Sequence, residues 1–170
     1  MSNKTNFILE YLFVVLLGTL LHFLYELSGK NAIVALFCPI NESTWEHLKL
    51  LFFPMLLLTI QNLFTDYGKS PNFFPARITG ILSGFSFIII AFYTFTGVIG
   101  NIVEWLNIAI FLFGTFVTFW VEKKRYSFPM HKGKFISKRS AILILFILIL
   151  LFILFTVAPP NIGLFRVPNE

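Results

Sequence analysis

Charged residues are scarce in this 170-residue chain, and their scarcity decides the class of protein. Only 12% of the residues are Asp, Glu, Lys or Arg, while 57% are hydrophobic and 23 are phenylalanine. The mean hydropathy is +0.83. A water-soluble globule of this size needs far more polar surface than these residues supply. The composition therefore excludes a soluble fold and predicts an integral membrane protein.

Cysteines, simple metal motifs and long linkers are almost as scarce. Cys38 is the single cysteine, so no disulfide forms within the chain. No His-Glu-x-x-His motif is present, which removes one familiar helical signature of a zinc enzyme. No linker is long enough to hold a separate soluble domain, so we expect residues 1–170 to form a single transmembrane domain.

Hydrophobic segments long enough to cross a membrane recur five times. A helix rises about 1.5 Å per residue, so roughly 20 apolar residues are needed to cross the hydrocarbon core. We therefore expect an all-α integral membrane helical bundle with five transmembrane helices. The expected spans cover about residues 7–27, 45–64, 76–96, 102–121 and 141–158.

Positive charge gathers between the last two of these segments. The loop 123–139 carries seven of the thirteen Lys and Arg residues, and basic loops stay on the cytoplasmic side. Counting through five spans, this predicts a multi-pass protein of the cell membrane with a cytoplasmic N-terminus and an extracytoplasmic C-terminus. The same loop is expected to attract anionic lipid, at roughly 1 kcal/mol per well-placed basic residue. Nucleic acid is not an expected partner, because the charges flank spans and are not interleaved with exposed aromatic residues.

The polar stretch PINESTWEH, residues 39–47, lies at the outward start of the second span. Ser43 followed three residues later by Glu46 forms a capping-box pattern, which satisfies free backbone amides at a helix start. Asn101 and Glu104 repeat the arrangement at the start of the fourth span, where a carboxylate also complements the helix dipole. Helix capping is thus one interpretation of these polar residues.

Capping does not account for His22 and Glu26, near the outward end of the first span. They lie one turn apart on one helix face, and Glu26 is at the negative end of the helix dipole, where a carboxylate is disfavoured. Ionisable groups inside a membrane are costly unless they have partners. We expect the two residues to act as a coupled pair in contact with the outward ends of the second and fourth spans. The candidate ligand-binding residues of this outward polar cluster are His22, Glu26, Asn41, Glu42, Glu46, His47 and Glu104.

The segments HFLYELSG and PINESTWEHLKLLFFP together resemble the signature of a small uncharacterised family of multi-spanning bacterial membrane proteins. Its members carry a similar His-x-x-Tyr-Glu-x-Ser-Gly segment followed by Asn-Glu-Ser-x-Trp-Glu-His. The resemblance extends from His22 to Pro54, about a fifth of the chain. It implies no particular activity, so it points to these residues without naming their chemistry.

Three functions are open for the outward polar cluster. Binding or transport of a small ligand or ion ranks first, because intramembrane ionisable residues commonly line such pathways. A metal-dependent enzyme acting at the outer leaflet ranks second, with His22, Glu26 and His47 as candidate ligands of zinc or a similar ion. A structural accessory protein ranks third, since the small residues at Gly80 and Gly84 let another helix approach closely, within the chain or in a homo-oligomer. The sequence identifies no cofactor.

Overall fold

The computed structural model describes residues 3–101, 103–127 and 136–167, apart from the side chains of residues 3–6. These residues are all-α, as the sequence predicts. The elements are α1 (Asn3–Leu27), α2 (Ala32–Ala35), α3 (Thr44–Asn62), α4 (Asp66–Lys69), α5 (Phe73–Ile99), α6 (Glu104–Tyr126), α7 (Lys138–Val157) and the short 3₁₀ helix η2 (Gly163–Phe165).

Four helices are long and apolar enough to cross a membrane, which indicates a multi-pass membrane protein. They are Phe7–Leu27 within α1 and the whole of α5, α6 and α7. Four of the five expected spans correspond to these helices. Residue 102, where the expected fourth span begins, lies outside the described residues, as do Lys132 and Lys134 of the basic loop. The remaining expected span, the second at residues 45–64, corresponds to α3, which is not among the four candidates.

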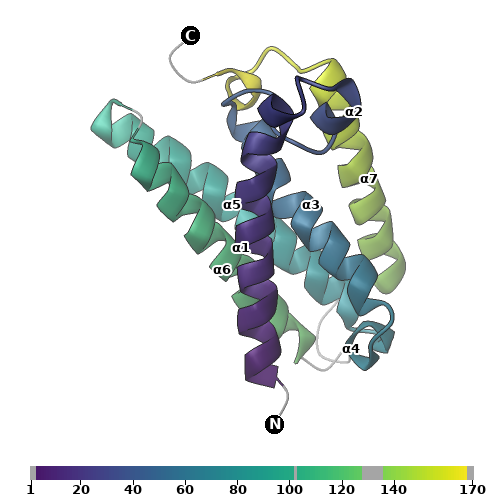
Figure 1. The fold of residues 1–170 in the computed structure, drawn as a ribbon. Coiled ribbons are helices and arrows are strands. Elements are labelled where there is room, and N and C mark those ends of the chain that lie inside the picture. The colour runs from purple at the N-terminus through teal and green to yellow at the C-terminus, as the bar shows by residue number, and fades with distance from the viewer. Residues whose placement is uncertain (1–2, 102, 128–135, 168–170) are drawn as a thin grey trace.

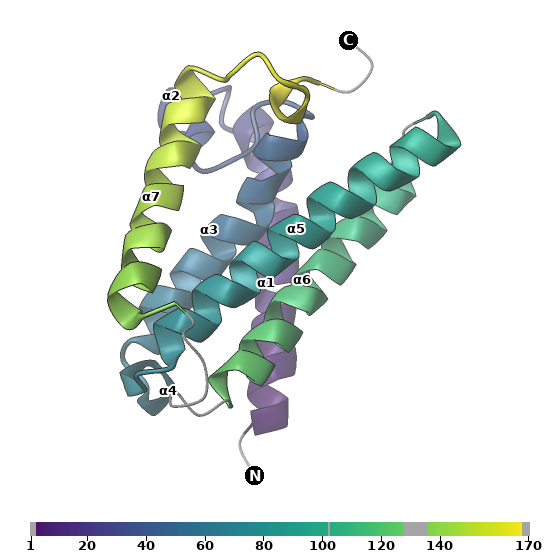
Figure 2. The ribbon, with the colours of Figure 1, turned by 180° about the vertical axis from the view of Figure 1, so that it is seen from behind.

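The long helices run alternately up and down one bundle (Figure 1). The beginning of α1, α4 and the end of α6 lie at one end, which we call the inner end. The end of α1, α2, the beginning of α3 and η2 lie at the other, which we call the outer end. The two chain termini are consequently at opposite ends of the molecule. Seen from behind, α5 and α6 lean away from the other helices toward the outer end (Figure 2).

Helix α3 occupies the centre of the bundle, where it packs against α1 and α5. Its Phe52 ring is fully buried and lies 4.8 Å from the ring of Phe152 on α7, measured between centroids. At the outer end, Trp45 packs against both Phe152 and Phe165 of η2, at 4.7 and 5.0 Å. Because other helices surround it, α3 tolerates polar residues such as Glu46 and Lys49 that a lipid-facing helix would not.

Helices α5 and α6 form the most extensive helix pair, and glycine permits their close approach. A Cβ atom added to Gly84 would collide with Thr118 Oγ1, and one added to Gly80 would lie 2.6 Å from Thr118 O. The small residues of this segment therefore do admit a neighbouring helix, and that helix is α6. Such contacts matter in a membrane, where helices associate through packing because lipid tails are as apolar as their side chains.

The beginning of α6 corrects one expectation. Asn101 was expected to cap this helix, but Val103 occupies the N-cap position and makes no side-chain capping bond. Glu104 is the first helical residue, as a carboxylate that complements the dipole should be. The capping pattern failed here because a turn at Gly100, whose φ is +76°, precedes an extended residue that sets the helix start two residues later.

Substituting Gly84→Ala tests the close contact of α5 with α6. We expect this change to destabilise the folded protein by about 1–3 kcal/mol, since the added methyl group overpacks a filled interface. Gly97→Ala is the matched control, because Gly97 lies in the same helix with no atom close to the position of its Cβ. Denaturation in detergent, followed by circular dichroism, compares the two. Equal stability of the Gly84→Ala variant and the parent would contradict the close packing.

Candidate functional site

The outer end is organised around Lys49, whose side chain is completely buried. Its ammonium donates to Glu46 Oε2 and to Thr156 Oγ1, both at 2.7 Å. It also reaches the backbone carbonyl oxygens of Ala35 at 2.9 Å and Cys38 at 3.2 Å. These partners come from α3, α7, α2 and the loop after α2, so one cation holds four segments together. A buried ammonium needs such complete pairing to offset the loss of its hydration.

Glu46 extends this network to the loop that precedes α3. Its Oε2 also accepts a hydrogen bond from the amide of Ile40 at 3.0 Å. One half of the expected capping box is confirmed, because Ser43 Oγ accepts from the amide of Glu46. The other half is wrong: the Ser43 amide donates to Asn41 Oδ1 at 2.9 Å, while the Glu46 carboxylate is drawn to Lys49. Asn41 and Glu46 thus shape the loop that carries Glu42.

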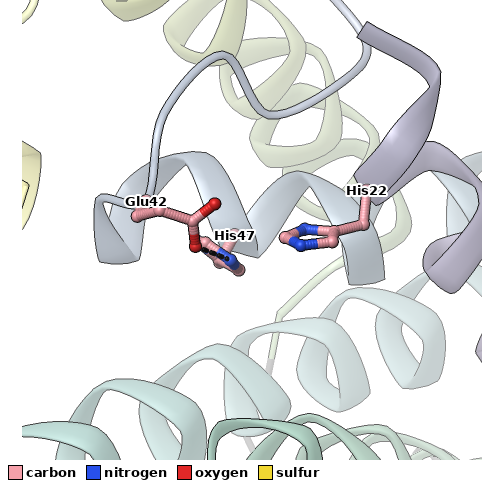
Figure 3. Close-up of side chains that lie close together, drawn as sticks. All are labelled: His22, Glu42 and His47. Atoms are coloured by element: carbon pink, nitrogen blue, oxygen red, sulfur yellow. Dashed lines mark ion pairs between the residues drawn. The ribbon is translucent and has the colours of Figure 1, made fainter. Parts of the chain in front are cut away.

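The side chains of His22, Glu42 and His47 lie close together where this loop and α3 meet the end of α1 (Figure 3). His47 Nε2 lies 3.2 Å from Glu42 Oε2, and the rings of His22 and His47 are 5.3 Å apart between centroids. One potential metal-ligating atom from each of the three residues lies within 4.8 Å of the others. Among the described residues, His22 Nδ1 is buried without a hydrogen-bond partner. Three metal-ligand side chains therefore meet at the junction of α1 and α3.

The hydrogen bonds of His47 determine which of its ring nitrogens faces the group. Nδ1 lies 3.0 Å from the carbonyl oxygen of Ser43, which can only accept, so Nδ1 carries a proton. In the neutral ring Nε2 is then a lone-pair acceptor that faces the carboxylate of Glu42. Two acceptors at this distance repel unless a proton or another cation lies between them. When a proton occupies this position, His47 is an imidazolium, and its hydrogen bond to Glu42 holds the pKa of the Glu42 carboxyl below its usual range.

A cavity of about 430 Å³ opens beside His47 and Glu42. Its polar lining includes Glu104 and Asn107 from α6, so the beginning of the fourth expected span does face the same cavity. Its apolar wall comes chiefly from Leu50, Ile88, Phe92, Ile110 and Phe111. The cavity thus joins a polar end to a hydrophobic wall, a combination that suits an amphipathic or small polar ligand.

Glu26 is not part of this group: its carboxylate pairs with Lys30, whereas His22 does meet the outward end of α3 as expected. Glu26 Oε1 is 3.5 Å from Lys30 Nζ, and both side chains are largely exposed. Lys30 has a φ of +62°, which turns the chain just past the end of α1 and brings the ammonium back to the carboxylate. This nearby cation stabilises Glu26 at the negative end of the helix dipole without any help from α3 or α6.

The inner end holds a second polar group that the sequence analysis did not identify. Arg77 Nε on α5 lies 3.0 Å from Glu122 Oε1 on α6, and both side chains are almost completely buried. Tyr67 on α4 donates to the same oxygen at 2.8 Å. The signal in the sequence was two opposite charges at the ends of adjacent expected spans, since Arg77 is the second residue of 76–96 and Glu122 directly follows 102–121.

Substituting Lys49→Met tests whether the ammonium holds the outer end together. We expect the folded protein to lose about 3–5 kcal/mol of stability, because the change strands the buried carboxylate of Glu46. Lys30→Met, which breaks only the exposed pair with Glu26, is the control and should cost less than about 1 kcal/mol. Equilibrium unfolding in mixed micelles measures both. A loss for Lys49→Met no larger than that for Lys30→Met would contradict the assigned role.

A protein-family model matches residues 1–168 of the chain, and its description is "Family of unknown function (DUF6512)". No curated protein and no solved structure matches the chain. The family match extends well beyond the segment from His22 to Pro54 on which the resemblance was based. It supplies no activity, so the chemistry has to be argued from the geometry.

Proposed function

We propose that this chain, which belongs to the family of unknown function DUF6512, binds a divalent transition-metal ion through His22, Glu42 and His47. The observation that carries the proposal is the meeting of one ligand atom from each residue within 4.8 Å. Two imidazoles and one carboxylate form a donor set typical of catalytic zinc, which leaves a further coordination position open. The same set also suits iron(II).

The environment of His47 supports a cation at this position. The Ser43 carbonyl fixes the proton on Nδ1 and aims the Nε2 lone pair at Glu42, which is the arrangement of a metal-ligating histidine with an outer-shell hydrogen bond. A divalent ion bound by Nε2, Glu42 and His22 would take the place of the proton that otherwise lies between Nε2 and the Glu42 carboxylate. The buried Nδ1 of His22, which has no partner among the described residues, would gain one if it is the ligating nitrogen.

The ligand atoms of the three residues lie farther apart than those of a zinc site, so they would have to move slightly closer together to bind an ion. Ligand atoms around a tetrahedral zinc ion lie roughly 3.4 Å apart, given metal–ligand distances of about 2.0–2.2 Å. The longest separation here is up to 4.8 Å. Glu42 is exposed on the loop before α3, so the carboxylate has room to close this difference while the two histidines stay on their helices.

Cobalt(II), which reports its coordination by visible absorption, tests the site directly. We expect about one cobalt per chain, and His47→Ala should weaken binding by at least about 100-fold, since losing an outer-shell partner alone typically costs about 10- to 100-fold. Affinity should fall as the pH drops from about 7.5 to 5.5, because protons compete for the imidazoles. Glu26→Gln, an exposed carboxylate on the helix of His22, is the control and should bind as the parent does. Stoichiometric binding that survives in both His22→Ala and His47→Ala would refute the site.

A metal-dependent enzyme is the second candidate, and the adjoining cavity favours it. Glu104 and Asn107 line the same cavity as His47 and Glu42, so a substrate bound there would lie beside both the metal and a further carboxylate. This carboxylate is suited to act as a general base. The apolar wall of the cavity would fit the hydrophobic part of an amphiphile at the outer leaflet.

An open coordination position is what distinguishes this second candidate from a closed structural site. Acetohydroxamate, a small bidentate metal ligand, should change the visible spectrum of the cobalt-loaded protein if a position faces the cavity. Glu104→Gln should leave cobalt affinity within about twofold of the parent, because Glu104 is not a ligand. A spectrum that does not respond to acetohydroxamate would show that the site is closed and would contradict an enzymatic role.

We also propose that α3 is a fifth membrane span, with the N-terminus cytoplasmic and the C-terminus outside. The alternating course of the helices, which leaves the termini at opposite ends (Figure 1), supports an odd number of crossings. The basic residues between α6 and α7 support the orientation, and they would meet anionic lipid of the inner leaflet. The His22, Glu42 and His47 group would then face outward.

Reporter fusions test this topology. Green fluorescent protein fused after residue 170 should be exported by the general secretion route and stay dark, whereas alkaline phosphatase at the same point should be active. The matched pair of fusions in the loop between α6 and α7 should behave the opposite way. A fluorescent C-terminal fusion would exclude five spans in this orientation.

A further inference from the structure

The inner end contains a cavity of about 510 Å³ that lies far along the bundle from the His22, Glu42 and His47 group. The beginning of α1, the end of α3, α4 and the end of α6 all contribute to it, and these elements gather at the same end in both views (Figures 1 and 2). Its lining includes the carboxylates of Glu10, Asp66 and Glu122, the ammonium of Lys123, and aromatic rings that include Phe7, Tyr67 and Tyr126; Asp66 is paired with Lys69. This cavity is independent of the proposed function.

Glu122 lines this cavity with an incompletely paired carboxylate. Its Oε1 receives the hydrogen bond from Tyr67 and lies beside Arg77 Nε. Its Oε2 is buried and has no hydrogen-bond partner among the residues that the structure describes. Only 3% of the residue is exposed. A buried carboxylate oxygen without a donor is costly, so Glu122 gives the wall of this cavity a negative group that would gain from a further donor or cation nearby.

Glu10 adds a second carboxylate to the cavity. Its one hydrogen bond among the described side chains comes from Asn62 Nδ2 at 3.3 Å. No basic side chain within ion-pair distance of Glu10 appears in the described part of the chain. Arg77 compensates the charge of Glu122, but the charge of Glu10 is left without a cation in contact. The cavity therefore favours a ligand with positive charge.

Aromatic rings form much of the remaining wall. The rings of Tyr67 and Tyr126 are stacked, with centroids 4.2 Å apart, and Phe7 packs edge-on against Phe119 at 5.6 Å. The ammonium of the exposed Lys123 already lies over the Phe7 ring, 5.7 Å from its centroid. Aromatic faces combined with carboxylates recognise organic ammonium groups through cation–π attraction and charge-assisted hydrogen bonds.

A metal ion fits this cavity less well than an organic cation. Within the described ranges, the group of His, Cys, Asp and Glu ligand atoms close enough to share an ion is His22, Glu42 and His47, at the other end. Glu10 and Glu122 belong to no group of three or more such residues in the described part of the chain. Bare metal cations also gain less from aromatic walls than weakly hydrated ammonium groups do.

From these observations we infer that the inner cavity binds an organic ammonium group, with Glu10 and Glu122 as its anionic partners and Phe7, Tyr67 and Tyr126 as its aromatic wall. Two sources carry this chemistry: the ethanolamine headgroup of a membrane lipid and a free soluble amine. Lys123 at the lining of the cavity would meet the phosphate next to an ethanolamine amine.

Calorimetric titration of the full-length protein with tetramethylammonium and with ethanolammonium chloride, at constant ionic strength, tests the binding. Glu10→Gln removes the charge but keeps an oxygen for Asn62, and it should raise the dissociation constant at least about tenfold. Phe7→Leu removes an aromatic face and should raise it about two- to fivefold. Glu26→Gln and Phe13→Leu, the matched changes at exposed positions of α1, should leave it within about twofold.

The outcomes separate clearly. Failure of the parent to bind either ammonium ion overturns the inference, and so does binding that Glu10→Gln and Phe7→Leu leave unchanged. Competition by sodium or potassium as effective as that by ammonium ions would also overturn it, in favour of a metal-cation site. Native mass spectrometry then identifies the source. If the parent retains phosphatidylethanolamine in preference to phosphatidylglycerol and Glu10→Gln loses this preference, the ligand is a lipid headgroup. If only the free ammonium ions bind, the ligand is a soluble amine. Neither result depends on cobalt binding at the outer end.

Discussion

The buried ammonium of Lys49 is the interaction on which the outer half of the molecule depends. Its partners lie on α2, the following loop, α3 and α7, so a single charge joins all four segments. Removing the cation would leave two carbonyl groups, a hydroxyl and a carboxylate in an apolar setting. Because Glu46 also receives the amide of Ile40, the same charge fixes the loop that presents Glu42 to His47. The geometry of the candidate metal site therefore depends on the Lys49 ammonium, although the hydrogen bonds of Lys49 go to none of the three candidate ligands.

The inner end is likewise held together by a buried ion pair and its hydrogen bonds. There Arg77 and Glu122 join α5 to α6, and Tyr67 adds α4 through the same carboxylate oxygen. Between the two ends, α5 and α6 meet at Gly80 and Gly84 with little room for side chains. Buried polar groups in a membrane act as fixed points, because their alternative is an unpaired charge in hydrocarbon. The Lys49 network, the Arg77–Glu122 pair and the close contact of α5 with α6 together position both cavities.

Several features of the fold and the site could be predicted from the sequence because their causes are local. Length and hydropathy identified α1, α5, α6 and α7, and the Ser43 side chain caps the helix that follows it, as its pattern indicated. Whether α3 spans the membrane was harder to predict. Its polar residues fit a position at the centre of the bundle, but that position becomes apparent only once the neighbouring helices are placed. The ionic partners of Glu46 and Glu26 are only three and four residues away, a spacing at which helical side chains can meet, so this signal was present but not used. The distant partners could not be predicted: packing alone brings Arg77 to Glu122 and Lys49 to Thr156. Which carboxylate finds which cation depends on backbone turns and packing that the sequence pattern does not encode.

Amide hydrogen exchange at Ile40 tests the central claim, that Lys49 orders the loop before α3. The account predicts that this amide, which donates to Glu46 Oε2, exchanges slowly in the parent and at least about tenfold faster in Lys49→Met. Core amides of α5 and α6, which have no contact with Lys49, serve as the internal reference and should keep their rates under native conditions. An unchanged rate at Ile40 in a folded Lys49→Met variant would contradict the claim, because the loop would then hold its position without the buried cation.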